Sequence, residues 1–203
     1  MQGLQITDVL FKSFPMWLLW ITSFVGLAFF IERIMYFSKN RAGKYDLLET
    51  VKDKIQKEKV SQILEELNSV KSTPLIRVIK AGLENIKSPK EKLHQIMTNQ
   101  INKEKMQFEK NVAIIGTISH ISPLLGLFGT VIGIIIAFGK ISVTGSGGSA
   151  VIAGGVALAL ITTAGGIIIA VPAVIAYNYF VNKISEIVQH LEIVRDEFIV
   201  GIR

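Results

Sequence analysis

Thr130 and Thr163 are the polar residues of this sequence whose positions could serve chemistry inside a membrane. Both lie in a long stretch, residues 111–182, whose one charged side chain is Lys140. Along a helix, Thr130 is about 15 Å from Lys140 and Thr163 is about 22 Å from Gly148. A hydrocarbon core about 30 Å thick would hold both hydroxyls near its midplane. The pair could line a polar path, or each hydroxyl could simply bond a carbonyl of its own helix.

The centres of the apolar stretches contain no Asp, Glu, Lys or Arg. A proton relay in a membrane normally uses an ionisable side chain, and a hydroxyl does not titrate near neutral pH. If this protein moves protons, we therefore expect a partner to supply the titrating carboxylate.

Enzyme chemistry has little support in the sequence. His94, His120 and His190 are isolated and lack the spacing of metal ligands, and there are no cysteines. Ser119 and Ser122 flank His120, but nothing supplies an orienting acid or an oxyanion hole. We predict no enzyme, no metal and no organic cofactor. His120 is interpreted as a polar residue that faces a lumen or another subunit.

Small residues recur at helical spacing around the two threonines. Gly126, Thr130 and Gly133 lie along one helix face, and Gly129 with Gly133 forms a GxxxG pair. Small residues allow membrane helices to approach closely. The predicted helix-packing residues are Gly126, Gly129, Gly133, Ala159, Gly166 and Pro172.

The chain is long enough in apolar residues for three membrane spans. We place the first at 13–37, the second at 111–139 and the third at 151–182, with a Gly- and Ser-rich turn at 140–150. Residues 1–12 are expected to form a periplasmic or interfacial segment, or merely the frayed start of the first span. The predicted fold class is an all-α membrane protein with three transmembrane helices.

The charge distribution predicts the orientation. Of the 22 Lys and Arg residues, 16 fall between positions 38 and 111, together with ten acidic residues. Such mixed charge indicates a solvated helical region and not a nucleic-acid-binding arm. By the positive-inside rule, region 38–110 and the helix at 183–203 are cytoplasmic, and the N-terminus is periplasmic.

The polar region is predicted to be helical. Thr73-Pro74 interrupts its apolar periodicity, and Ser88-Pro89 is expected to start a helix with a capping box and proline at the first helical position. No Pro or Gly follows before Ile115, so we expect that helix to run unbroken into the second span. Both later spans are thus long and extend into a cytoplasmic helical bundle.

The C-terminal segment carries a coiled-coil-like apolar seam with spacings of 3, 4, 3 and 4. Its packing partner is open: the other long helix, a neighbouring subunit or the chain's own bundle. The seam consists of Ile184, Ile187, Leu191, Val194 and Phe198.

Two motifs in the spans resemble the ExbB/TolQ/MotA family of bacterial proton-driven motor subunits. They are PLLGLFGTVIG at 123–133 and ALALITTAGGIIIAVPAVIAYN at 157–178, and Glu32-Arg33 at the end of the first span fits as well. The resemblance covers essentially the whole chain. Its size and three spans are similar to ExbB or TolQ and unlike the four-span flagellar member.

The resemblance implies a homopentamer in the bacterial inner membrane around a dimer of a single-span protein similar to ExbD or TolR. That partner carries a membrane aspartate, which Thr130 and Thr163 would face. Protons would be the driving ion, and a protein of the TonB or TolA kind would receive the displacement. Membrane lipid is an expected partner and nucleic acid is not.

One position departs from the family pattern. Well-studied ExbB and TolQ members carry a glutamate five residues before the threonine of the third span, where this sequence has Leu158. Either that glutamate is dispensable or the chain belongs to a divergent branch with a different coupling. The leading hypothesis is an ExbB-like subunit that energises TonB-dependent outer-membrane transport. The alternatives are a TolQ-like subunit for envelope integrity and a passive homo-oligomeric pore or scaffold. A neighbouring gene for a short one-span protein with an intramembrane Asp would favour the motor.

Overall fold

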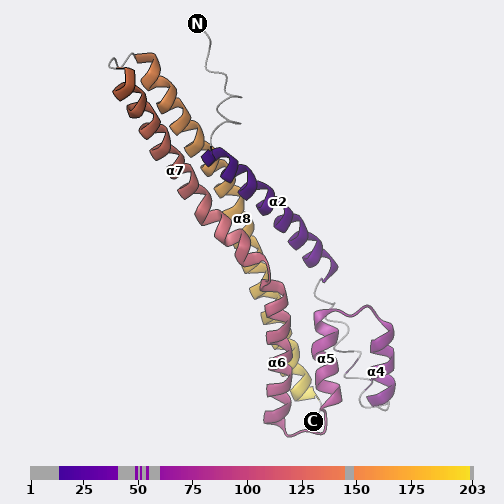
Figure 1. Cartoon of the computed structure of the whole chain (residues 1–203). Helices are drawn as coiled ribbons and strands as arrows, with labels where there is room; N and C mark the ends of the chain where they lie inside the picture. Colours follow the sequence, from indigo (N-terminus) through magenta and orange to yellow (C-terminus); the bar gives the residue numbers. More distant parts are fainter. Residues whose placement is uncertain are drawn as a thin grey trace. The chain divides into compact units, whose positions relative to one another are not determined.

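The computed structural model describes residues 14–40, 49, 51, 54, 60–144 and 149–201 (Figure 1). Within these residues the regular structure is helical. The expectation for residues 1–12 lies outside the described residues, as do residues 145–148 of the predicted turn at 140–150, whose other residues are helical. The helices are α2 (Phe14–Lys39), α4 (Val60–Ser69), α5 (Pro74–Glu84), α6 (Lys90–Glu109), α7 (Val112–Thr144) and α8 (Ser149–Gly201).

Three of these helices are long and apolar enough to cross a membrane. The candidate spans are Phe14–Lys39, Val112–Gly139 and Ile152–Gly201, and at most 28% of the most apolar window of each is buried. Helices that expose this much apolar surface need lipid or other protein around them. The predicted fold class, all-α with three spans of which the last two are long, is confirmed.

The chain divides into two compact units. The membrane unit comprises Met1–Glu32 and Asn111–Tyr179, and the bundle unit comprises Arg33–Lys110 and Phe180–Arg203. Helices α2 and α8 contribute residues to both units, whereas α7 belongs to the membrane unit and α4, α5 and α6 belong to the bundle unit.

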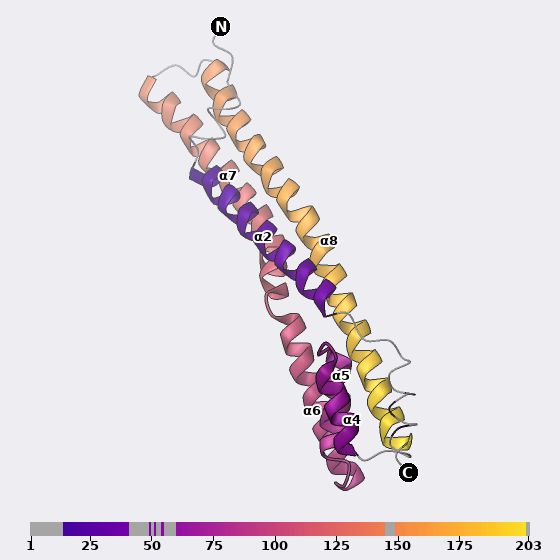
Figure 2. The same cartoon turned by 90° about the vertical axis from the view of Figure 1, so that its right-hand side faces the viewer.

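In the membrane unit, α7 and α8 run side by side in opposite directions (Figures 1 and 2). The contacts give the register, since Gly126 lies against Thr163 and Gly133 lies against Gly155. Helix α2 packs on this pair, with Gly26 against the Ile118 side chain. Both long helices continue through a proline: Pro123 lies inside α7 and Pro172 inside α8.

The bundle unit has a conventional apolar core. Helix α5 begins at Pro74 after Thr73, whose Oγ1 accepts a hydrogen bond from the Ile76 amide, so the predicted break is a capped helix start. The Phe198 ring of α8 packs where a Cβ on Gly82 of α5 would stand. The apolar seam of the C-terminal segment is at most 6% exposed and packs within the chain's own bundle; it consists of Ile184, Ile187, Leu191, Val194 and Phe198.

Two details of the predicted long helix from Ser88 onward are wrong. Helix α6 ends at Glu109, because Lys110 is extended (φ −51°, ψ 133°) and Asn111 takes a left-handed conformation (φ 65°). Asparagine adopts that conformation more readily than other non-glycine residues, so a helix can end without Pro or Gly. The N-cap of α6 is Pro89 with no side-chain cap bond, so the expected capping box does not form.

An arginine supports the end of α6. Arg33 is 2% exposed, and its Nη1 donates to the Gln107 and Phe108 carbonyls at 3.3 Å. The last carbonyls of a helix lack partners within the helix, and a cation there also complements the helix dipole. The two bonds from Arg33 replace the amide donors that the Gln107 and Phe108 carbonyls would have if α6 continued.

Candidate functional site in the α7–α8 seam

The glycines of α7 and α8 bring the two helix backbones together in the α7–α8 seam, which we define as Gly126, Gly129 and Gly133 with the α8 residues that they touch. A Cβ on Gly126 would lie 3.1 Å from the Thr163 Cα, and one on Gly133 would lie 2.8 Å from the Gly155 carbonyl oxygen. Real Cβ atoms essentially never come as close as the contact at Gly133, and the contact at Gly126 is tighter than most real ones. The seam therefore depends on glycine.

The α8 side of the seam is equally tight. A Cβ on Gly166 would lie 2.5 Å from the Ser122 carbonyl oxygen, and Ala159, 4% exposed, places its Cβ 3.0 Å from the Cβ position of Gly133. Where membrane helices approach this closely, dispersion contacts and weak hydrogen bonds hold them.

Thr163 lies at the middle of the seam and bonds across it. Its Oγ1 donates to the Gly126 carbonyl oxygen at 3.3 Å, and its side chain is partly buried. Gly126 already lacks a side chain, so the threonine can reach the main chain of α7 directly. Thr163 therefore does not bond a carbonyl of its own helix, which was one of the two interpretations of a membrane threonine.

Thr130 satisfies its hydroxyl locally. Its Oγ1 donates to the Leu127 carbonyl oxygen at 2.6 Å in an exposed bond on α7. Thr130 lies one helical turn beyond Gly126, about 6 Å along the axis. Thr130 and Thr163 therefore flank the same stretch of seam, and none of the described contacts is a hydrogen bond between them.

Thr162 is a seam residue that sequence reasoning did not select as a site. It is fully buried, and its Oγ1 contacts the Leu158 and Ala159 carbonyl oxygens at 3.1 and 2.8 Å. A Cβ on Gly129 would meet the Thr162 Oγ1 at 2.3 Å. The sequence signal that could have indicated Thr162 is the GxxxG pair that contains Gly129, because a glycine leaves room for a side chain on the facing helix.

Pro172 lies outside the seam. It is exposed on α8 and lines, with Gly26 of α2 and Ile118 of α7, an apolar groove of about 280 Å³. Pro172 thus lies on the side of the α7–α8 pair against which α2 packs.

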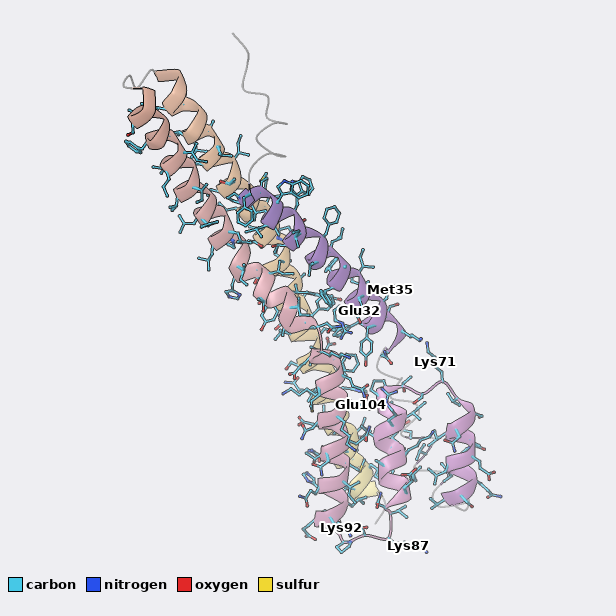
Figure 3. The ribbon with its side chains drawn as sticks, in the orientation of Figure 1. Glu32, Met35, Lys71, Lys87, Lys92 and Glu104 are labelled. Atoms are coloured by element: carbon cyan, nitrogen blue, oxygen red, sulfur yellow. The ribbon has the colours of Figure 1, made fainter. Side chains whose placement is uncertain are left out.

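In the bundle unit, two of the arginine–carboxylate ion pairs are accompanied by a shifted pKa. The Arg77 guanidinium donates from Nε to Oε1 and from Nη2 to Oε2 of Glu104, at 2.7 and 2.5 Å, and this bond raises the pKa of Arg77. Glu104 is labelled on α6 in Figure 3. The Arg195 Nε donates to Asp196 Oδ1 at 2.9 Å, which lowers the pKa of Asp196. Among the described residues no group of three or more His, Asp or Glu side chains could hold a metal ion.

Comparison with known proteins identifies the family. Residues 70–193 match the MotA/TolQ/ExbB proton channel family. The biopolymer transport protein ExbB of Salmonella typhimurium is 31% identical over 195 residues, which cover 89% of this chain and 77% of that protein. The chain belongs to this family.

Other members match a shorter part of the chain. The Tol-Pal system protein TolQ of Haemophilus influenzae is 39% identical over 102 residues, 50% of this chain and 45% of that protein. The ExbB of Aquifex aeolicus is 42% identical over 88 residues, 41% of this chain and 60% of that protein. The match thus spans less than half of the TolQ relative. Family membership and three apolar helices together make this a multi-pass protein of the inner membrane.

Proposed function

We propose that the chain is the multi-span subunit of an inner-membrane motor driven by the proton-motive force. The observation that carries the proposal is the α7–α8 seam, which lies in the part of the chain that matches the proton channel family and has Thr163 at its centre. A partner helix with an intramembrane carboxylate would meet the uncovered side of this seam.

The roles of the two threonines differ in this proposal. The Thr163 hydroxyl bonds the Gly126 carbonyl at 3.3 Å, a long bond that it can exchange for one to a carboxylate or water. The Thr130 hydroxyl is held by Leu127 at 2.6 Å, and its oxygen keeps a free lone pair as an acceptor. Together they would orient a neutral carboxylic acid while its proton is in transit.

The proposed assembly is a pentamer around a dimer of an ExbD- or TolR-like single-span protein, with protons as the driving ion. The N-terminus and the 140–150 turn face the periplasm, in accord with the excess of Lys and Arg in region 38–110. Energising TonB-dependent outer-membrane transport is the leading task. A TolQ-like task in envelope integrity is supported by the 39% identity to TolQ.

Reconstitution tests the proposal. The chain and its single-span partner are purified together, counted by native mass spectrometry and placed in liposomes with an imposed pH gradient. We expect five copies around two partners, proton uptake only when the partner is present, and a loss of about tenfold or more in Thr163→Val. Thr163→Ser, which keeps the hydroxyl, should retain most of the uptake.

A passive pore or scaffold predicts the opposite pattern. An assembly that forms without the partner, and whose permeability is the same in Thr163→Val as in the wild type, would refute the motor. Leu158 would then be the position to explain, since the resemblance to ExbB and TolQ implies a glutamate there.

A further inference from the structure

His120 is the imidazole inside the apolar part of α7, and its position is unusual. It is exposed, and its neighbours on the same face toward the centre of the span, Leu124 and Leu127, are exposed apolar residues. Ionisable side chains within a membrane almost always face protein or a water-filled path, because lipid does not solvate them. The His120 face of α7 is therefore not a lipid face.

Helix geometry places His120 on the side of α7 that α2 leaves uncovered. Ile118 marks the direction of α2, because it contacts the Cβ position of Gly26. His120 lies about 160° around α7 from Ile118 and about 80° from Thr130. Thr130 in turn lies about 40° from Gly126 of the seam. The seam, Thr130 and His120 thus follow one another around the uncovered side.

Depth adds a second ordering. His120 is ten residues before Thr130, about 15 Å along the helix, and eight residues after Val112, about 12 Å. It therefore stands between the threonines and the end of α7 that is cytoplasmic in the proposed orientation.

The hydrogen bonds of His120 settle which nitrogen is free. Its Nδ1 lies 2.7 Å from the Gly116 carbonyl oxygen, and a carbonyl only accepts, so Nδ1 carries the hydrogen. Ser119 Oγ, 3.2 Å from Nδ1, donates to the same carbonyl at 2.6 Å. Nε2 then keeps its lone pair, and none of the described contacts occupies it. Nε2 is therefore the ring nitrogen that can accept a proton.

Few other titratable groups belong to this part of the membrane unit. From α8, the Tyr177 ring packs against Gly116, one turn before His120. From α2, Glu32 accepts a hydrogen bond from Asn111 Nδ2 at 3.4 Å, at the Val112 end of α7. Imidazole is the side chain that gains and loses a proton most readily near neutral pH.

We propose that His120 carries protons between the threonine pair and the cytoplasmic end of the span. Nε2 accepts a proton relayed by water from the partner's carboxylic acid, which becomes a carboxylate. The imidazolium then gives that proton to water on the cytoplasmic side and returns to neutral imidazole, while Nδ1–H stays bonded to Gly116. This inference rests on the proposed motor function.

The test uses the complete complex in liposomes, with proton uptake measured across a range of pH on the cytoplasmic side. His120→Asn removes the proton-carrying nitrogen and keeps an amide that can donate to Gly116. We expect uptake to fall about tenfold or more and to lose its pH dependence in the neutral range. In His120→Ala, added imidazole should restore uptake. Thr117→Val, an exposed change one turn away on the same face, is the matched control and should conduct normally.

The outcomes separate this inference from the function on which it rests. If the wild-type complex takes up no protons, the motor proposal itself fails. If the wild type conducts and His120→Asn conducts equally well with the same pH dependence, only the histidine inference fails. If His120→Asn loses subunits in native mass spectrometry and imidazole restores nothing in His120→Ala, the histidine is a subunit contact and the inference is overturned.

Discussion

The bundle unit and the α7–α8 seam bury different kinds of side chain. The bundle unit buries large ones, with Phe108, Phe180 and Phe198 at most 1% exposed. In the α7–α8 seam the buried apolar residue is small: Ala159 is 4% exposed, and Ala137 of α7, 3% exposed, packs beside the seam against Gly155. In water, burying large apolar side chains stabilises a fold by about 1.5–3 kcal/mol each. In lipid there is no hydrophobic driving force between helices, so α7 and α8 must be held together by close approach of their backbones.

Buried polar groups differ in the same way. In the bundle unit, Glu104 of α6 is 1% exposed. It accepts hydrogen bonds from Arg77 of α5 and from Gln100, one turn earlier on α6. In the membrane unit, Ser122 and Thr162 bond carbonyls of their own helices. A hydroxyl that is satisfied locally costs little in lipid, and it leaves the helix pair free of any fixed charge. Thr163 is the exception, since it bonds across the seam.

The largest effect that would sharpen this comparison is expected from Phe198→Ala. Removing a fully buried phenylalanine should cost about 3–5 kcal/mol of unfolding free energy. We expect faster hydrogen exchange in α5, α6 and the C-terminal part of α8, with the α7–α8 seam unchanged. Val200→Ala, at a position 71% exposed, is the control. Equal loss of protection in both units would show that they unfold as one.

A smaller effect, in the other unit, is expected from Gly166→Ala. The new Cβ would stand 2.5 Å from the Ser122 carbonyl oxygen, so the backbones must separate. Overpacking of this kind costs about 1–3 kcal/mol, and we expect faster exchange confined to the central turns of α7 and α8. Gly139→Ala is the matched control, because nothing lies within 4 Å of its Cβ position. If the two variants behave alike, the seam is not held by close approach.

The smallest effect is a pH dependence of the bundle unit. Hydrogen bonding to Arg195 lowers the pKa of Asp196 in the folded chain below the ordinary value of an aspartate. The carboxylate therefore stabilises the fold above its unfolded pKa, and this contribution is lost as the pH falls through the lower folded pKa. Because the aspartate is exposed, the loss should be under about 1 kcal/mol. Thermal unfolding between pH 5 and pH 3 should show a shallower decline in Asp196→Asn; an unchanged slope would contradict the assignment.

Much of the fold could be predicted from the order of residues alone. The three apolar stretches, the break at Thr73-Pro74 and the burial of the C-terminal seam that ends at Phe198 all follow from composition and helical period. The break at Asn111 could not be predicted, because the left-handed conformation there is favoured for asparagine only when the surroundings support it. Glu32, distant in sequence, bonds Asn111, and Arg33 caps the last carbonyls of α6.

The candidate site was predictable to a similar degree. Sequence marked Thr130 and Thr163 by their depth, and Gly126 by its spacing, because both follow from the rise and period of a helix. Only the tertiary structure decided that Thr163 bonds across the seam while Thr130 bonds its own helix, and that Thr162 is the hydroxyl buried against Gly129. Depth is a property of one helix, whereas the partner of a hydroxyl depends on how two helices are rotated against each other, and no single helix carries that information.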